Sequence, residues 1–250
     1  TYPFVLQVAP GQYTEELNQI ILPDYVSIRG ESNYNTVITQ NSGSTLLEDA
    51  SMIYAGDNSE IKDIVVKLAD SNKSLNSAGI YSRDKSNVVI DNCIVNTSSN
   101  SSTYGNTYGI YIKNGSNNKI LNSTIDINSS SLEGNVNAIY LNNTTPQLLN
   151  NSIDMLTSNS TVNNGIYMTG CIGSTSSIKD KLYIENLNLS NNYFTSNTGS
   201  TNTGIDINNS SFILKNSEIE VSNNLDDTNN YGIKLNSTGN VAPYLSKTTT

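Results

Sequence analysis

A short segment of Gly or Ala, then Ile, then most often Tyr, recurs along the chain and restricts the possible folds more than any other feature. A polar turn and a second apolar segment follow most of its copies. Its central isoleucines are Ile80, Ile110, Ile139, Ile166, Ile205 and Ile233; Ile53, which follows Met52, occupies the same slot, and Ile28 is assigned to an earlier one. Successive isoleucines from Ile28 to Ile233 are 25 to 39 residues apart. A unit of this length cannot bury its apolar face alone and must stack on its neighbours. The repeat therefore predicts one continuous solenoid.

The repeat also predicts how the chain is divided. Residues 1–50 depart from the pattern and are expected to form an atypical N-terminal capping coil, and residues 51–250 to form the regular coils, about eight in all. The one long interval, 39 residues, predicts an inserted loop near residues 169–181. Beyond Leu235 the pattern fades without a helix to cover the stack, so we expect the native chain to continue or the end to be covered.

Alternation within the repeated strand predicts which side chains face the core. In the copy at 109–112, Ile110 and Ile112 share one face, which must be the interior, so Tyr111 points outward. The equivalent tyrosines on five consecutive coils are Tyr54, Tyr81, Tyr111, Tyr140 and Tyr167. Two interpretations stay open. The rings could bind a ligand or a second subunit, or they could stabilise the sheet through each other.

The N-terminal segments carry a resemblance to a known family. Pro10-Gly11-x-Tyr13-x-Glu15, Leu22-Pro23 and the segment 26–30 resemble the first coil of right-handed parallel β-helix proteins of the pectin-lyase-like superfamily, and the repeats resemble its coils of three short strands. The resemblance implies an all-β, right-handed parallel β-helix. It also implies an inward polar ladder, formed by the small polar residue of each second strand: Asn92, Ser123, Asn151, Asn192 and Asn216. Such a scaffold serves enzymes, tailspikes and adhesins alike, so it does not fix the function.

Charge and composition exclude some classes of partner. The formal net charge is −9 and no run of Lys or Arg occurs, which argues against nucleic acid. No apolar run has the length of a membrane span, so we expect no membrane insertion. The sequence indicates no cofactor.

Candidate catalytic and metal-binding residues are few. The segment Asn202-Thr203-Gly204-Ile205-Asp206, followed by Asp226 and Asp227, resembles the polygalacturonase pattern, which implies Asp206, Asp226 and Asp227 as its carboxyl groups. The chain lacks the first Asp of that pattern, and it contains no His. Asp126 and Asp154 occupy equivalent positions on adjacent coils and could hold calcium, although solvated surface acids are the simpler interpretation.

These observations predict a non-enzymatic structural or adhesive module. It would be extracellular, on a cell surface or a virus particle, and would bind a glycan or polysaccharide, or copies of itself, through the outer face of the tyrosine-bearing sheet. The alternative is a carbohydrate-active enzyme, a polysaccharide hydrolase or lyase similar to polygalacturonase, that acts along the same face.

Overall fold

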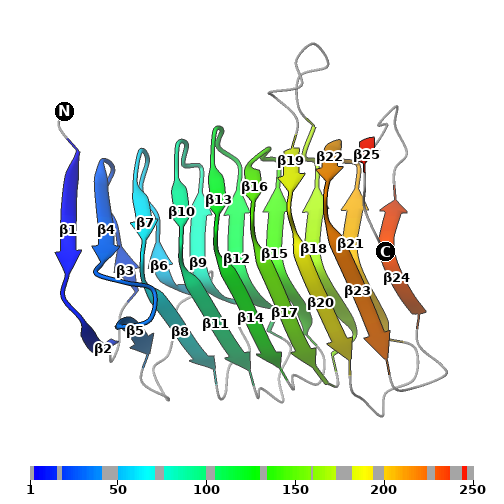
Figure 1. Cartoon of the computed structure of the whole chain (residues 1–250), viewed down its shortest axis with the longest axis horizontal. Coiled ribbons are helices and arrows are strands. Elements are labelled where there is room, and N and C mark those ends of the chain that lie inside the picture. Colours follow the sequence, from blue (N-terminus) through cyan, green and yellow to red (C-terminus); the bar gives the residue numbers. More distant parts are fainter. Residues whose placement is uncertain are drawn as a thin grey trace.

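The fold is a right-handed parallel β-helix, as the repeat and the resemblance predict. The structure, a computed structural model, describes residues 3–15, 19–40, 50–70, 76–99, 105–129, 134–158, 160–172, 182–193, 200–223, 229–236 and 244–246. Their strands form three parallel sheets, and successive strands in the chain belong to successive sheets. Figure 1 shows the strands of each sheet side by side along the long axis, with β1 (Phe4–Val8) at one end and β24 (Asn229–Asn236) at the other.

Nine described strands form sheet A, and eight each form sheets B and C. Sheet A contains β1, β4 (Val26–Gly30), β7 (Glu60–Lys62), β10 (Val89–Asp91), β13 (Lys119–Leu121), β16 (Gln147–Leu149), β19 (Leu182–Glu185), β22 (Phe212–Lys215) and β25 (Tyr244–Ser246). Sheet B contains β2 (Gly11–Glu15), β5 (Thr36–Gln40), β8 (Val65–Asp70), β11 (Ile94–Ser99), β14 (Thr124–Ser129), β17 (Ser152–Thr157), β20 (Asn188–Tyr193) and β23 (Glu218–Asn223). Sheet C contains β3 (Ile20–Ile21), β6 (Ala50–Tyr54), β9 (Ser77–Arg83), β12 (Thr107–Lys113), β15 (Asn135–Asn142), β18 (Val162–Thr169), β21 (Thr201–Asn208) and β24.

The repeated isoleucines stack in sheet C, with one exception. From Ile53 to Ile233, each pairs with the next along the sheet. Ile28 pairs instead with Ile61 in sheet A, and the sheet C partner of Ile53 is Ile20. The assignment of Ile28 to this column was therefore wrong. The reason is that the first coils lack the Gly-Ile-Tyr signature, and spacing alone cannot tell one sheet from another.

The glycine of the repeated signature is required by the packing of the core. A Cβ on Gly109 would lie 2.5 Å from Ile125 Cγ2 and 2.6 Å from the carbonyl oxygen of Ala138, closer than real Cβ atoms approach. Gly109 therefore faces the interior, as does the fully buried Ile110 next to it. Two consecutive residues directed inward interrupt the alternation of the strand, as at a bulge. This interruption decides which side chains reach the outer face of sheet C.

The expected polar ladder is wrong in its register. Ser123 and Asn151 lie in a buried column, where the Ser123 backbone N–H donates to Asn151 Oδ1 at 3.0 Å. Asn92 and Asn216 belong to the turn position one residue earlier, where φ is positive, and Asn192 lies within β20. The error arose because the sequence template aligned Val89 with Ile120, whereas Ile120 pairs with Ile90.

A ladder of amides does run along the turn that connects sheets A and B. Asn92, Asn122, Asn150, Asn186 and Asn216 all have φ near 50° there. Asn150 Nδ2 donates to Asn122 Oδ1 at 3.0 Å, and Asn186 Nδ2 donates to Asn150 Oδ1 at 2.8 Å. Asn tolerates this left-handed backbone better than other residues with a side chain. Part of the high Asn content therefore serves the turns.

At the N-terminal end, strands β1 to β3 continue the same three sheets. Phe4, Val5 and Leu6 on β1 are exposed.

The predicted inserted loop falls mostly outside the described residues, because β18 ends at Thr169 and β19 begins at Leu182. Within the described part of the chain, no helix is long and apolar enough to cross a membrane.

Candidate functional site on the outer face of sheet C

Five tyrosines form a continuous column on the outer face of sheet C. Tyr54, Tyr81, Tyr111, Tyr140 and Tyr167 pair in register on β6, β9, β12, β15 and β18. Neighbouring rings lie with their centroids 5.3, 4.8, 4.7 and 5.1 Å apart along the column. Only Tyr140 and Tyr167 approach parallel stacking, with an interplanar angle of 25°. We call this set the tyrosine column.

The first part of the tyrosine column is packed rather than open. Tyr81 points outward as predicted, yet it is only 2% exposed. Tyr81 lies between Tyr54 and Tyr111 and belongs to one buried cluster with Ala78 and Tyr108. Here the rings bury one another, which is how aromatic side chains on adjacent strands stabilise a sheet.

Tyr108 was not predicted to belong to this face. Its ring lies 5.0 Å from Tyr111 and 5.2 Å from Tyr140. Simple alternation from Tyr111 places Tyr108 in the interior, but the inward pair Gly109 and Ile110 shifts the phase by one residue. The glycine before each isoleucine is the sequence signal that could have revealed this shift. A second outward column therefore runs beside the first, through Ala78, Tyr108, Asn137, Asn164 and Thr203.

Beyond Tyr108 the side chains of the second column are smaller, and they leave a hollow on the outer face of sheet C. Asn137 and Asn164 follow Tyr108, so two amides stand where the preceding coil has an aromatic ring. The hollow has a volume of about 340 Å³. Its lining includes three tyrosine rings, the two amides and one ion pair: Tyr108, Tyr140, Tyr167, Asn137, Asn164, Asp206 and Lys234. We call it the sheet C hollow.

One acceptor in the sheet C hollow has no hydrogen-bond donor among the described residues. Asn164 is 1% exposed, and its Nδ2 donates to Asn137 Oδ1 at 2.8 Å. Its Oδ1 has no partner. A buried acceptor without a donor destabilises the fold by about 1–3 kcal/mol, so such atoms are rare and often mark a ligand or water position. A ligand with a hydroxyl or amide donor would satisfy it.

Asp206 continues the tyrosine column past Tyr167, and Lys234 follows it on the next strand. Asn236 Nδ2 donates to Asp206 Oδ1 at 2.7 Å, and Lys234 Nζ lies 3.8 Å from Asp206 Oδ2. Burial raises the pKa of the Asp206 carboxyl, and the charge of Lys234 and the bond from Asn236 offset part of that rise. The other two predicted carboxyl groups, Asp226 and Asp227, lie outside the described residues.

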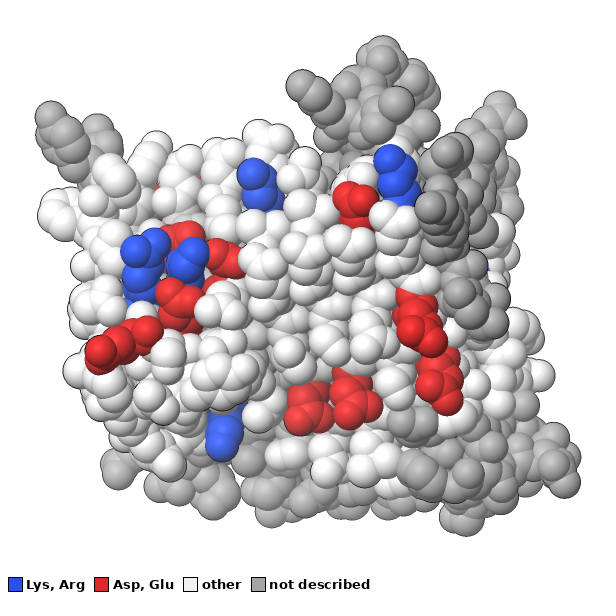
Figure 2. Space-filling view, in the orientation of Figure 1, with Lys and Arg blue, Asp and Glu red and all other residues white. Residues whose placement is uncertain are grey.

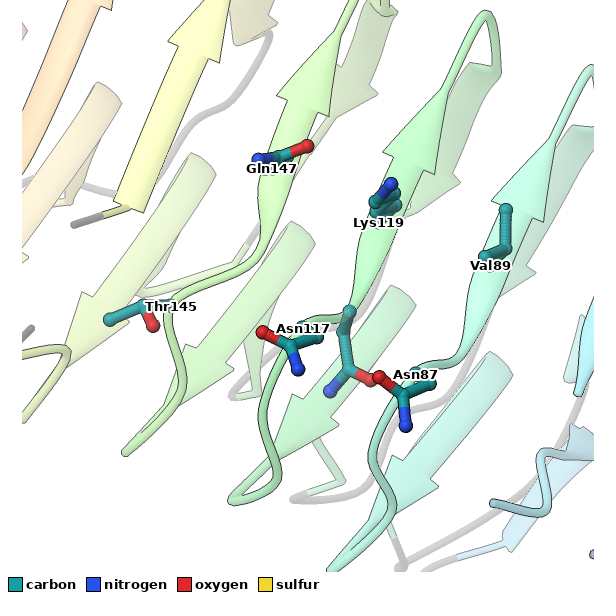
Figure 3. Close-up of a pocket in the computed structure, with 7 residues that line it drawn as sticks. Asn87, Val89, Asn117, Lys119, Thr145 and Gln147 are labelled. Carbon is teal, nitrogen blue, oxygen red and sulfur yellow. The ribbon is translucent and has the colours of Figure 1, made fainter. Parts of the chain in front are cut away.

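A second, larger hollow lies on the outer face of sheet A, over β10, β13 and β16. It has a volume of about 570 Å³. Figure 3 shows Val89, Lys119 and Gln147 on the strands, and Asn87 and Asn117 on the turns before them. The buried amide in its lining, Asn118, is satisfied, because its Oδ1 accepts from Val88 N and its Nδ2 donates to the Lys85 carbonyl. The sheet A hollow has no aromatic residue in its described lining and is the weaker candidate.

Asp126 and Asp154 lie side by side on β14 and β17, as the sequence predicted. Figure 2 shows acidic side chains gathered over these strands and over β23. Burial, and then repulsion from Asp154, raise the pKa of the Asp126 carboxyl. Within the described ranges, no three His, Cys, Asp or Glu residues are grouped so as to hold a metal ion.

No protein-family model matches the chain, and no curated protein matches it. Several solved structures are similar at a low level, among them the following three. The catalytic domain of a GH87 alpha-1,3-glucanase variant in complex with tetrasaccharides is 13% identical, over 98% of this chain and 61% of that one, with a TM-score of 0.33. The Streptococcus pneumoniae surface protein and adhesin PfbA is 8% identical over 97% and 91%, with a TM-score of 0.26. The A-module of Azotobacter vinelandii mannuronan C-5 epimerase AlgE4 is 12% identical over 97% and 90%, with a TM-score of 0.23.

Proposed function

We propose that the chain is a non-enzymatic structural or adhesive module that binds a glycan in the sheet C hollow. The observation that carries the proposal is the stacked pair Tyr140 and Tyr167, which borders a hollow whose buried amide Asn164 has an unmet acceptor. The proposed setting is extracellular, on a cell surface or a virus particle.

The chemistry of this lining suits a sugar ring. Aromatic rings offer a flat apolar surface to the C–H face of a sugar, and Tyr adds a polar tip. Amides and hydroxyls at the edge of such a surface fix the orientation of the ligand by hydrogen bonds. Both kinds of group are present, since Asn137 and Asn164 lie in the same hollow as the rings of Tyr140 and Tyr167. An extended chain of sugars would follow the stacking axis, along which the hollow runs from β12 to β24.

Binding without cleavage is the better supported form of this function. Hydrolysis of a glycosidic bond generally uses two carboxyl groups on either side of the bond. Among the described residues of the lining, Asp206 is the one carboxyl group, and it is already engaged by Lys234 and Asn236. The alternative is a carbohydrate-active enzyme in which Asp206 acts as the acid. The raised pKa of Asp206 favours that alternative, because a general acid must hold its proton near the working pH.

The test is a glycan-array screen of three proteins. The wild type is compared with the double variant Tyr140→Ala/Tyr167→Ala and with the control Tyr34→Ala. The control removes a tyrosine that is 77% exposed in the turn between β4 and β5, which connects sheets A and B. We expect the wild type and the control to bind the same glycans and the double variant to lose them while it stays folded by circular dichroism. Binding that survives in the folded double variant would refute the proposal.

Two further measurements on the same proteins separate the alternatives. Incubation of each bound glycan with the wild type and with Asp206→Asn, followed by analysis of the products, detects cleavage, which would establish the enzyme instead. Light scattering gives the mass in solution. A wild type that binds no glycan but is oligomeric, beside a monomeric double variant, would make this face a contact between copies of the chain.

A further inference from the structure

We infer that the ligand of the sheet C hollow is an uncharged glycan, and that the Asp206–Lys234 pair excludes both acidic and amino sugars. This inference rests on the proposed glycan binding and adds the class of ligand.

The hollow is electrically balanced. Its described lining contains one acid, Asp206, and one base, Lys234, whose charged atoms lie 3.8 Å apart. Because these two charges already pair with each other, they leave no net charge to compensate that of an acidic or an amino sugar placed on the Tyr167 surface. Such a sugar would lose part of its hydration in a partly buried site without gaining a counter-charge, which costs free energy. A neutral sugar does not meet this penalty.

The hydrogen-bonding groups point to the same class. The unmet group in the lining of the hollow is an acceptor, Asn164 Oδ1. A carboxylate or sulfate group placed against Asn164 Oδ1 offers acceptors only and leaves it unsatisfied, whereas a sugar hydroxyl in the same place can donate to it. The position next to Asn164 therefore favours a hydroxyl over an anionic group.

The cations on this face of sheet C do not alter the balance of the hollow. Arg83 and Lys113 stand on β9 and β12, beside the packed tyrosines, and neither belongs to the lining of the hollow. Arg83 Nε lies 3.4 Å from Asp84 Oδ2. Over the whole chain the formal net charge of −9 opposes the approach of polyanions. The local and the long-range electrostatics thus disfavour acidic polysaccharides.

The experiment compares polymers that differ in charge but share a β-1,4-linked backbone. The probes are a soluble neutral β-1,4-glucan, its uronate and sulfated counterparts, and chitosan at a mildly acidic pH at which its amines are protonated, each at about 50 and about 500 mM salt. The wild type is expected to bind the neutral polymer at least about tenfold more tightly than each charged one, with little dependence on salt.

Two variants shift the charge of the hollow in opposite directions and control for each other. Asp206→Asn leaves the hollow with a net positive charge. This variant is expected to reduce the difference in affinity between the neutral polymer and the sulfated or uronate polymers by about tenfold. Lys234→Gln leaves a net negative charge and is expected to reduce the difference in affinity between the neutral polymer and chitosan. Tyr140→Ala/Tyr167→Ala should abolish binding of every polymer.

The outcomes separate this inference from the proposed function. Tyrosine-dependent binding that favours an acidic or an amino polymer in the wild type would overturn the inference and leave the proposed glycan binding standing. Equal affinity for neutral and charged polymers, unchanged in both charge variants, would also overturn it. Absence of binding to every polymer would overturn the proposed function and, with it, this inference.

Discussion

The two halves of the outer face of sheet C carry the same tyrosine repeat but differ in what lies beside it. In the half formed by β6, β9 and β12, Ala78 and Tyr108 lie beside the column, and the rings of Tyr54, Tyr81 and Tyr111 close over one another. In the half formed by β15, β18 and β21, two amides lie beside Tyr140 and Tyr167, and the face is hollow. A tyrosine in this repeat is therefore a packing residue or a candidate binding residue according to the residue three positions before it.

The inner face does not cause this difference. Ile80 and Ile110 in the packed half are completely buried, and so are Ile139 and Ile166 in the hollow half. The core therefore stacks in the same way along both halves, and the difference between them lies in the side chains on the outer face. The comparison predicts that substitutions in the packed half change stability and those in the hollow half change binding.

The largest effect is expected for Tyr81→Ala in the packed half. Removal of a buried aromatic side chain destabilises a protein by about 3–5 kcal/mol, and Tyr81 contacts rings on both sides. Urea unfolding followed by circular dichroism measures the loss, with Tyr167→Ala as the matched variant from the hollow half. The comparison fails if Tyr167→Ala is as destabilising as Tyr81→Ala.

Tyr167→Ala should instead weaken glycan binding by about tenfold or more, equivalent to about 1.4 kcal/mol. Its ring is half-buried and stacked on one side only, by Tyr140 at 5.1 Å, so a sugar can use the rest of its surface. Isothermal calorimetry with a glycan from the array gives the affinity. Unchanged affinity in this variant would show that the hollow half is packing surface as well.

Asn137→Tyr should convert the hollow half into a packed one. The new ring would follow Tyr108 in its column and fill the space beside Tyr140. Added aromatic contacts, worth about 0.5–1.5 kcal/mol, offset the loss of the acceptor that Asn164 Nδ2 now uses. We expect glycan binding to fall at least about tenfold while the free energy of unfolding changes by less than about 1 kcal/mol. Retained binding in a folded variant would place the ligand elsewhere.

The sequence predicted the fold and the tyrosine column but not the hollow. Solenoid stacking and the register of Tyr54 to Tyr167 follow from the period of the repeat, because each coil must align its isoleucines to close the core. The hollow depends on the phase shift at Gly109, which a close contact in the core imposes and which simple alternation along the strand does not predict. The misplaced polar ladder has a similar cause. Aligning Val89 instead of Ile90 with Ile120 shifted the predicted register by one residue. The shift kept the period of the repeat but assigned Asn92, which lies in a turn, to the buried column.

The smallest expected effect concerns the charged end of the hollow half. Burial raises the pKa of the Asp206 carboxyl in the folded chain above its ordinary 3.8, so the folded state holds this proton more tightly than the unfolded state does. Protonation then stabilises the fold as the pH falls from neutral through the raised pKa, and this gain in the free energy of unfolding is complete below about 3.8.

Carbon-13 NMR of the Asp206 carboxyl should show a titration midpoint above 3.8. Lys234→Gln should raise that midpoint further, because the charge of the lysine lowers the pKa of the carboxyl. Thermal melts of the wild type against Asp206→Asn should show the wild type gaining relative stability over the same interval of pH. An unshifted midpoint would mean that water reaches this carboxyl freely, and the hollow half would then be a flat wet surface rather than a formed site.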